Sequence, residues 1–180
     1  STAAAEAVDH FDAQRLVAVF NSLFTAAFNT QLLGGAREPQ YEPASCAGAH
    51  HHLVFLEDFF ASALHEVAHW CIAGEQRRQQ RDFGYWYAPE GRDSDQQKAF
   101  ELVEIKPQAL EWLFSIACEY PFQVSVDNLD PDDGRPADTH DFCQRVFAQA
   151  RAWQVNGLPP RAAQFFTALA REFGTGRTTS

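Results

Sequence analysis

The sequence predicts a mainly helical α+β fold in which a small β-sheet accompanies several helices within one domain. The chain has 180 residues, enough for one domain with a substantial core. Hydrophobic residues make up 46% of it and aromatic residues 13%, which is typical of a globular protein. Most apolar residues recur at helical spacing, and only short runs favour strands. We expect one domain over residues 1–180, with loose tails at about 1–10 and 175–180.

The first third of the chain combines one amphipathic helix with short extended segments. Apolar residues recur every three to four positions from residue 12 to residue 29 and predict a helix at 12–29. Two prolines favour an extended conformation at 38–43, and small residues indicate a loop at 44–51. The apolar run 53–56 predicts a short strand. The triplet His50–His52 is assigned to the loop, because three adjacent side chains cannot all face one metal ion.

The next segment carries the pattern His65-Glu66-Val67-Ala68-His69, an HExxH motif within a run of helix-forming residues. Residues four apart share one face of an α-helix, so two imidazoles placed there can bind one metal ion. Apolar neighbours predict a largely buried helix, in which unsatisfied imidazoles would be costly. We therefore predict a metal site with His65 and His69 as ligands. The alternative is a chance match, with two core histidines hydrogen-bonded to the backbone.

Both ends of this helix carry expected signals. Asp58 is the expected N-cap, with Ser62 as its rival, and Gly74 is placed to end the helix. The polar and basic run 75–81 that follows predicts a solvated helix or loop, or a basic patch beside the site.

Aromatic residues dominate the segment 82–93, where Tyr85, Trp86 and Tyr87 stand between Gly84 and a Pro-Glu-Gly sequence. This arrangement predicts a strand that leads into a turn. Tyr85 and Tyr87 are candidates for a substrate-binding wall beside the metal site. Packing in the core is an equally good interpretation of these side chains.

A second long helix is predicted from Gln96 to Tyr120. Ser94 or Asp95 is its expected cap, and Pro107 is expected either to kink it or to begin a new helix.

Four polar residues of this helix, Glu101, Glu104, Gln108 and Glu111, share one stripe among apolar neighbours. A carboxylate in such a helix suits the third ligand of a two-histidine metal site, although a solvent-facing stripe fits the periodicity equally well. Periodicity does not separate Glu104 from Glu101. We assign Glu104 as the ligand because it lies close to Pro107, which disturbs the helix. Glu101 is then expected to support a ligand histidine.

The last third of the chain is expected to be mostly helical. Alternation predicts a strand at 122–126, and an Asp-, Pro- and Gly-rich composition predicts a surface loop at 127–139. Helices follow at 142–153 and 162–173.

Composition disfavours several classes of function. The net charge of −10 argues against nonspecific binding to nucleic acid. The four cysteines are widely spaced and form no CxxC pair, which argues against a thiolate zinc cluster; Cys71 and Cys118 lie in apolar runs and are interpreted as buried free thiols. No signal-peptide pattern and no membrane-spanning stretch is recognisable, so we expect a cytoplasmic protein.

Six blocks of sequence stand in a characteristic order along the chain. They are Phe20–Phe24, Phe28–Thr30, Ala61–Gly74, Asp82–Asp93, Phe100–Phe114 and Tyr120–Ser125. With these blocks the chain resembles the bacterial elongation factor P hydroxylase family, from about residue 15 to about residue 172. It departs from the family pattern at 56–58, where a His-Gly pair is expected in relatives.

The resemblance implies a metal-dependent hydroxylase that acts on a lysine of elongation factor P after this lysine has received a β-lysyl group. It also implies a site of two histidines and one carboxylate, which are His65, His69 and Glu104 in this chain. Such a ligand set leaves coordination sites of iron(II) open, at which O₂, the implied co-substrate, binds. A substrate tail with two amines needs acidic recognition, for which Glu101 or Glu111 is available.

Two other classes of function stay open at this point. In HExxH zinc peptidases the middle glutamate is the general base, so Glu66 would be catalytic in a zinc hydrolase; in a hydroxylase it would support the site. A binding module with a structural metal fits less well, because structural zinc sites usually use cysteine ligands. The sequence shows no recognisable anchor for 2-oxoglutarate.

Overall fold

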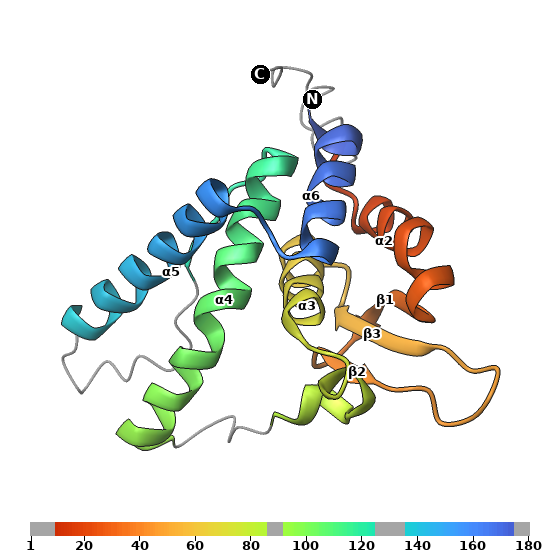
Figure 1. Ribbon diagram of the computed structural model, residues 1–180, viewed down its shortest axis with the longest axis horizontal. Coiled ribbons are helices and arrows are strands. Elements are labelled where there is room, and N and C mark those ends of the chain that lie inside the picture. The colour runs from red at the N-terminus through yellow and green to blue at the C-terminus, as the bar shows by residue number, and fades with distance from the viewer. Residues whose placement is uncertain (1–9, 86–91, 125–135, 175–180) are drawn as a thin grey trace.

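The structure of the protein is a computed structural model that describes residues 10–85, 92–124 and 136–174, apart from the side chains of 136–139. Mainly helical architecture with a small three-stranded sheet confirms the predicted fold (Figure 1). The elements are α2 (Ala13–Phe28), β1 (Thr30–Ala36), β2 (Gln40–Glu42), β3 (His51–Leu56), α3 (Phe60–Ile72), the 3₁₀ turns η1 (Arg77–Gln79) and η2 (Arg81–Gly84), α4 (Ser94–Cys118), α5 (Pro136–Asn156) and α6 (Pro160–Phe173).

Helix α3, which carries the HExxH motif, lies in the middle of the molecule (Figure 1). It packs against α4 on one side and against β3 and α2 on the other, while α5 covers the outer side of α4. The main core joins α2, the sheet, α3 and α6, and a smaller core lies between α4 and α5. Polar side chains of α3 therefore need partners from neighbouring elements. None of the described helices combines the length and the apolar character needed to cross a membrane.

Helix α2 matches its predicted range closely. Asp12 is the N-cap, and its side chain accepts a hydrogen bond of 2.9 Å from the Gln14 N–H. Leu16, Phe20 and Phe24 form the buried stripe that contacts the core. The helix thus forms one wall behind α3.

The sheet has the order β1-β3-β2, with β1 parallel and β2 antiparallel to β3. Strand β3 begins earlier than predicted: His51 and His52 pair with Thr30 and Gln31 of β1, so they are strand rather than loop residues. Pairing with β1 extends the strand beyond its apolar run, because backbone hydrogen bonds do not depend on side-chain polarity. At the irregularity of β1, a Cβ on Gly34 would lie 2.8 Å from the Phe55 ring.

The caps of α3 differ from those predicted. Neither Asp58 nor Ser62 caps the helix; the N-cap is Phe59, which has no side-chain cap bond. The Ser62 hydroxyl instead accepts a hydrogen bond from the Leu56 N–H, and so ties the helix to β3. The first backbone N–H groups of α3 therefore have no partner in the N-cap side chain, because Phe59 has no hydrogen-bond acceptor there.

The C-terminal end of α3 is held by arginines rather than by Gly74, which lies beyond the C-cap Ala73. Arg161 of α6 donates to the backbone carbonyls of Trp70, Cys71 and Ala73, and Arg78 also donates to Ala73. Cationic donors at a helix C-terminus satisfy free carbonyls and interact favourably with the helix dipole.

The segment 82–84 forms the 3₁₀ turn η2 and not the predicted strand. Asp82 and Phe83 have φ angles of 48° and 60°, a left-handed conformation that is unfavourable for residues other than glycine. A hydrogen bond of 2.9 Å from the Tyr41 N–H to the Asp82 carboxylate helps to hold it. The remainder of the predicted turn, 86–91, lies outside the described residues.

Helix α4 runs continuously from Ser94 to Cys118 through Pro107, so the proline does not start a separate helix. Its N-cap is Asp93, which forms a capping box with Gln96 and replaces the predicted Ser94 or Asp95. Helix α4 packs against α3 and α5, and this packing stabilises it although Pro107 lacks the N–H that would bond to the Val103 carbonyl.

The C-terminal helices follow the prediction with shifted boundaries. Helix α5 begins at Pro136, inside the predicted loop, and α6 begins at Pro160. Residues 122–124 have no regular secondary structure, so the predicted strand is absent there, while the rest of it lies outside the described residues.

Candidate metal centre

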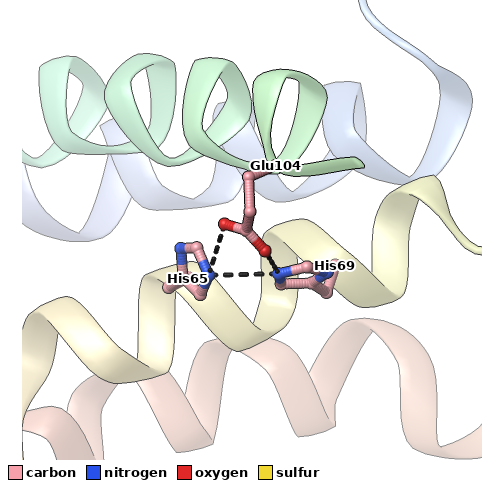
Figure 2. A group of neighbouring side chains, drawn as sticks. All are labelled: His65, His69 and Glu104. Carbon is pink, nitrogen blue, oxygen red and sulfur yellow. Dashed lines mark hydrogen bonds and ion pairs between the residues drawn. The ribbon is translucent and has the colours of Figure 1, made fainter. Parts of the chain in front are cut away.

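Three side chains from two helices converge at the middle of the molecule (Figure 2). Helix α3 presents His65 and His69 one turn apart, and α4 presents Glu104 opposite them. One carboxylate oxygen of Glu104 lies 2.9 Å from His69 Nε2 and the other lies 3.3 Å from His65 Nε2. The two Nε2 atoms are 3.1 Å apart. The structure therefore brings together the three residues that the sequence analysis proposed as ligands.

The donor atoms of this triad suit a divalent metal ion. One ligand atom from each residue lies within 4.8 Å of the others. Two ligands ~2.1 Å from one ion are ~3.0 Å apart at a right angle and ~3.4 Å apart at the tetrahedral angle. The two Nε2 atoms are 3.1 Å apart, within this range, and each lies 2.9 or 3.3 Å from one of the two Glu104 carboxylate oxygens, within the range or close to it. Two unprotonated imidazole nitrogens this close repel each other, and a bound cation removes the repulsion.

A fourth residue, Glu111, orients His65. Its Oε1 atom lies 2.6 Å from His65 Nδ1. The imidazole donates this hydrogen bond, because an ionised carboxylate only accepts. His65 Nε2 is thereby left facing His69 and Glu104. Carboxylates in this position fix the tautomer and ring orientation of metal-binding histidines.

Charge–charge interactions perturb two members of the triad. Burial alone would lower the pKa of His65, but Glu104 and Glu111 outweigh it and hold this pKa well above its ordinary value. Burial alone would raise the pKa of Glu104, but His69 and His65 outweigh it and hold this pKa well below its ordinary value. The site thus keeps an anionic carboxylate that is only 7% exposed, next to groups able to exchange a proton for a metal ion.

Glu66 of the HExxH motif borders a pocket beside the triad. The pocket has a volume of about 160 Å³ and is bordered by Glu66, His69, Glu104 and Asp82, together with the rings of Tyr41, Phe83 and Tyr85. Burial raises the pKa of Glu66; the two histidines lower it and the carboxylates of Glu104 and Asp82 raise it. An acidic and aromatic pocket therefore opens onto two of the three triad residues.

The other candidates from the sequence lie elsewhere. The Glu101 carboxylate accepts from Gln97 Nε2 at 3.5 Å and borders a separate pocket between α4 and α5, so it does not contact a triad histidine. Tyr85 borders the pocket beside the triad, with the Arg77 guanidinium 4.0 Å from its ring centroid. Tyr87 lies outside the described residues.

Comparison with known proteins identifies the family. The sequence model of the elongation factor P hydroxylase family matches residues 19–180. This chain belongs to the elongation factor P hydroxylase family. Elongation factor P lysine hydroxylase from Haemophilus influenzae is 43% identical to it over 160 residues, which cover 89% of this chain and 88% of that relative. The resemblance carried by the sequence blocks is confirmed.

The sequence analysis placed Glu111 on the polar stripe of this hydroxylase-family site but did not pair it with His65, and it did not single out Asp82. Helical geometry gives a signal for Glu111: seven residues turn an α-helix through ~700°, within ~20° of two full turns, so Glu111 points in nearly the same direction as Glu104. Glu101, three residues before Glu104, is rotated by ~60° from it. No comparable signal exists for Asp82, because its position depends on the left-handed turn at 82–83.

Proposed function

We propose that this chain hydroxylates a lysine side chain of translation elongation factor P after that lysine has received a β-lysyl group. The convergence of His65, His69 and Glu104 carries the proposal, in a chain that belongs to the elongation factor P hydroxylase family. The Haemophilus influenzae relative is named for lysine hydroxylation of elongation factor P. The cytoplasmic location expected from the sequence stays a prediction.

We further propose that the triad holds Fe(II), with O₂ as the co-substrate. Two histidines and one carboxylate are the ligand set of many non-haem iron oxygenases. When bound, a redox-active metal supplies the reaction with O₂ that inserts oxygen into an unactivated C–H bond, whereas zinc has no redox chemistry.

The residues of this chain have separable tasks in that reaction. His65 and His69 would hold the metal as neutral imidazoles, and Glu104 would contribute the balancing negative charge. Glu111 keeps the proton of His65 on Nδ1, so that Nε2 stays available. The Phe83 ring lies nearly parallel to that of His69, with centroids 6.5 Å apart and an angle of 8° between the planes, and places an apolar surface beside this ligand.

A zinc hydrolase with Glu66 as general base was the alternative drawn from the HExxH motif. Family membership favours the hydroxylase instead. Under the hydroxylase proposal Glu66 contacts the substrate or supports the site, so a Glu66→Gln variant keeps part of the hydroxylation activity. A variant that binds metal normally and loses all activity would return Glu66 to a general-base role.

The direct test is mass spectrometry of lysylated elongation factor P incubated with the Fe(II)-loaded protein in air. The expected product gains one oxygen atom on the modified lysine. An anaerobic sample and the His65→Ala variant serve as controls and are expected to give no product. Cleavage of an amide bond instead of oxygen insertion would refute the proposal in favour of hydrolysis.

A further inference from the structure

The pocket beside the triad has a chemical character that the metal site does not require. Its wall contains two carboxylates, Glu66 from α3 and Asp82 from η2, in addition to the Glu104 of the triad. Anionic groups gathered in a partly enclosed space repel each other unless a cation lies among them. A divalent metal ion bound by the triad is balanced by the carboxylate of its ligand Glu104 and by that of Glu111, which contacts His65. Glu66 and Asp82 therefore have charge to offer to another ligand.

The hydrogen bonding of these two carboxylates leaves acceptor atoms available. Asp82 uses Oδ1 to accept from the Tyr41 N–H at 2.9 Å, and no described residue donates to its Oδ2. Glu66 accepts no hydrogen bond from any side chain or backbone group in the described part of the chain, although it is largely buried and borders the pocket. A partly buried carboxylate with no donor is costly, which indicates that a donor arrives with a ligand.

The remaining wall is aromatic. Tyr41 and Phe83 stack with ring centroids 4.4 Å apart and an interplanar angle of 14°, and Tyr85 continues the same wall. The Tyr41 hydroxyl donates to the Arg78 carbonyl, and Tyr41 is only 1% exposed, so its ring supports the Phe83 ring from behind. Aromatic faces attract cations and pack against methylene groups.

The pocket has a volume of about 160 Å³ and is partly open to solvent, so it admits the end of a narrow chain. An aminoalkyl chain combines a cationic ammonium group with apolar methylene groups. Carboxylates next to aromatic side chains suit both parts of such a chain.

We propose that Glu66 and Asp82 form the seat for the ammonium groups of the substrate's aminoalkyl tail, with Phe83 and Tyr85 packed along its methylene groups. The proposal rests on the proposed function for the identity of the amine. Because the pocket is bordered by His69 and Glu104, a tail seated there lies directly beside the triad. Glu66 and Asp82 are thus the residues that select a cationic side chain over a neutral one.

The first test measures binding independently of catalysis. NMR titrations of the zinc-loaded full chain compare n-pentylamine, which is an ammonium at pH 7, with 1-pentanol, a neutral molecule of the same length. The wild type is expected to bind the amine at least ~10-fold more tightly than the alcohol, the effect of one hydrogen bond to a charged group. Glu66→Gln and Asp82→Asn are each expected to remove most of this preference.

Matched variants separate a seat for ammonium from other effects. Asp82→Asn keeps the acceptor for the Tyr41 N–H and removes only the charge. Glu42→Gln makes the same change of charge at an exposed residue of β2 that pairs with Arg81 at 3.4 Å, and it is expected to keep the preference for the amine. Amine binding that is equal in the wild type and both pocket variants would overturn the proposal. It would show that the amine binds to the metal ion or is attracted only by the overall negative charge of the protein.

The second test uses the substrate itself. With Fe(II) at saturation, Glu66→Gln and Asp82→Asn are expected to raise the KM for lysylated elongation factor P by ~10-fold or more. The kcat is expected to fall less, and the Glu42→Gln variant to match the wild type. Unchanged KM values in both pocket variants would refute the seat. If the wild type prefers the amine but adds no oxygen to elongation factor P, the seat stands and the proposed function fails.

Discussion

Removing the Glu111 carboxylate is the sharpest test of how the metal centre is built. In the Glu111→Ala variant, His65 loses its 2.6 Å hydrogen bond from Nδ1 and its ring is free to turn or change tautomer. The Glu111 side chain is only 13% exposed, so water replaces the lost acceptor only in part. Hydrogen bonds to charged groups contribute about 1.5–3 kcal/mol, and ~1.4 kcal/mol corresponds to a tenfold change in affinity. We expect metal affinity to fall by ~10–100-fold, the usual range for such partners.

Two further alanine variants set the scale for this effect. Glu104→Ala removes an anionic ligand. Structural zinc binding of about 10–16 kcal/mol over four ligands suggests ~2.5–4 kcal/mol for one, so we expect a loss of at least ~100-fold. Glu101→Ala removes a carboxylate of the same helix that contacts Gln97 and not a triad histidine. Its affinity is expected to stay within about threefold of the wild type, as for most surface substitutions.

The assay is competition between each variant and a fluorescent chelator for Zn(II), and for Fe(II) under anaerobic conditions. Thermal unfolding of the metal-free proteins checks that each variant is folded. The expected order of affinity loss is Glu104→Ala, then Glu111→Ala, then Glu101→Ala. The reasoning is refuted if Glu101→Ala loses the metal while Glu104→Ala keeps it, or if Glu111→Ala binds as tightly as the wild type.

Three other predictions follow from the same contacts. Glu104 and Glu111 hold the pKa of His65 well above 6.5, so protonated His65 stabilises the metal-free protein below pH 6.5, and this stabilisation is lost as the pH rises through the raised pKa. Metal binding at pH 7 is therefore expected to release about one proton. Calorimetry in buffers of different ionisation enthalpy measures this release, and its absence would contradict the prediction. Burial raises the pKa values of Cys71 and Cys118 to about 12. At pH 8 iodoacetamide is therefore expected to label the exposed Cys46, whereas Cys71 and Cys118 react only after the protein is denatured, and intact-protein mass spectrometry counts the labels. Arg161→Met removes three hydrogen bonds to carbonyls at the C-terminal end of α3 and is expected to lower the free energy of unfolding, measured in urea, by ~2–4 kcal/mol. A change below ~0.5 kcal/mol would show that water replaces the arginine as the donor to these carbonyls.

Local pattern in the sequence was sufficient for the long helices and for the pair of histidines, but not for strand β1 or for the turn at 82–84. The spacing of His65 and His69 places both on one face of α3, because the period of an α-helix is fixed by its backbone. The same periodicity singled out the stripe that holds Glu104 and Glu111 on α4. Helix existence was therefore predictable, while caps and boundaries were not, since the caps of α3 and α4 depend on contacts with neighbouring segments.

Only the tertiary structure decided which acids act together. The packing of α4 against α3 places Glu104 between the histidines and Glu111 behind His65, and it turns Glu101 toward a different pocket. One stripe of a helix can meet its neighbour in several rotations, and periodicity does not choose among them. Asp82 reaches the pocket through a left-handed turn held by the Tyr41 backbone, a contact between residues 41 positions apart. The sequence by itself determined the helix that carries His65 and His69, because helical period is a local property, and long-range packing determined the charged side chains around them.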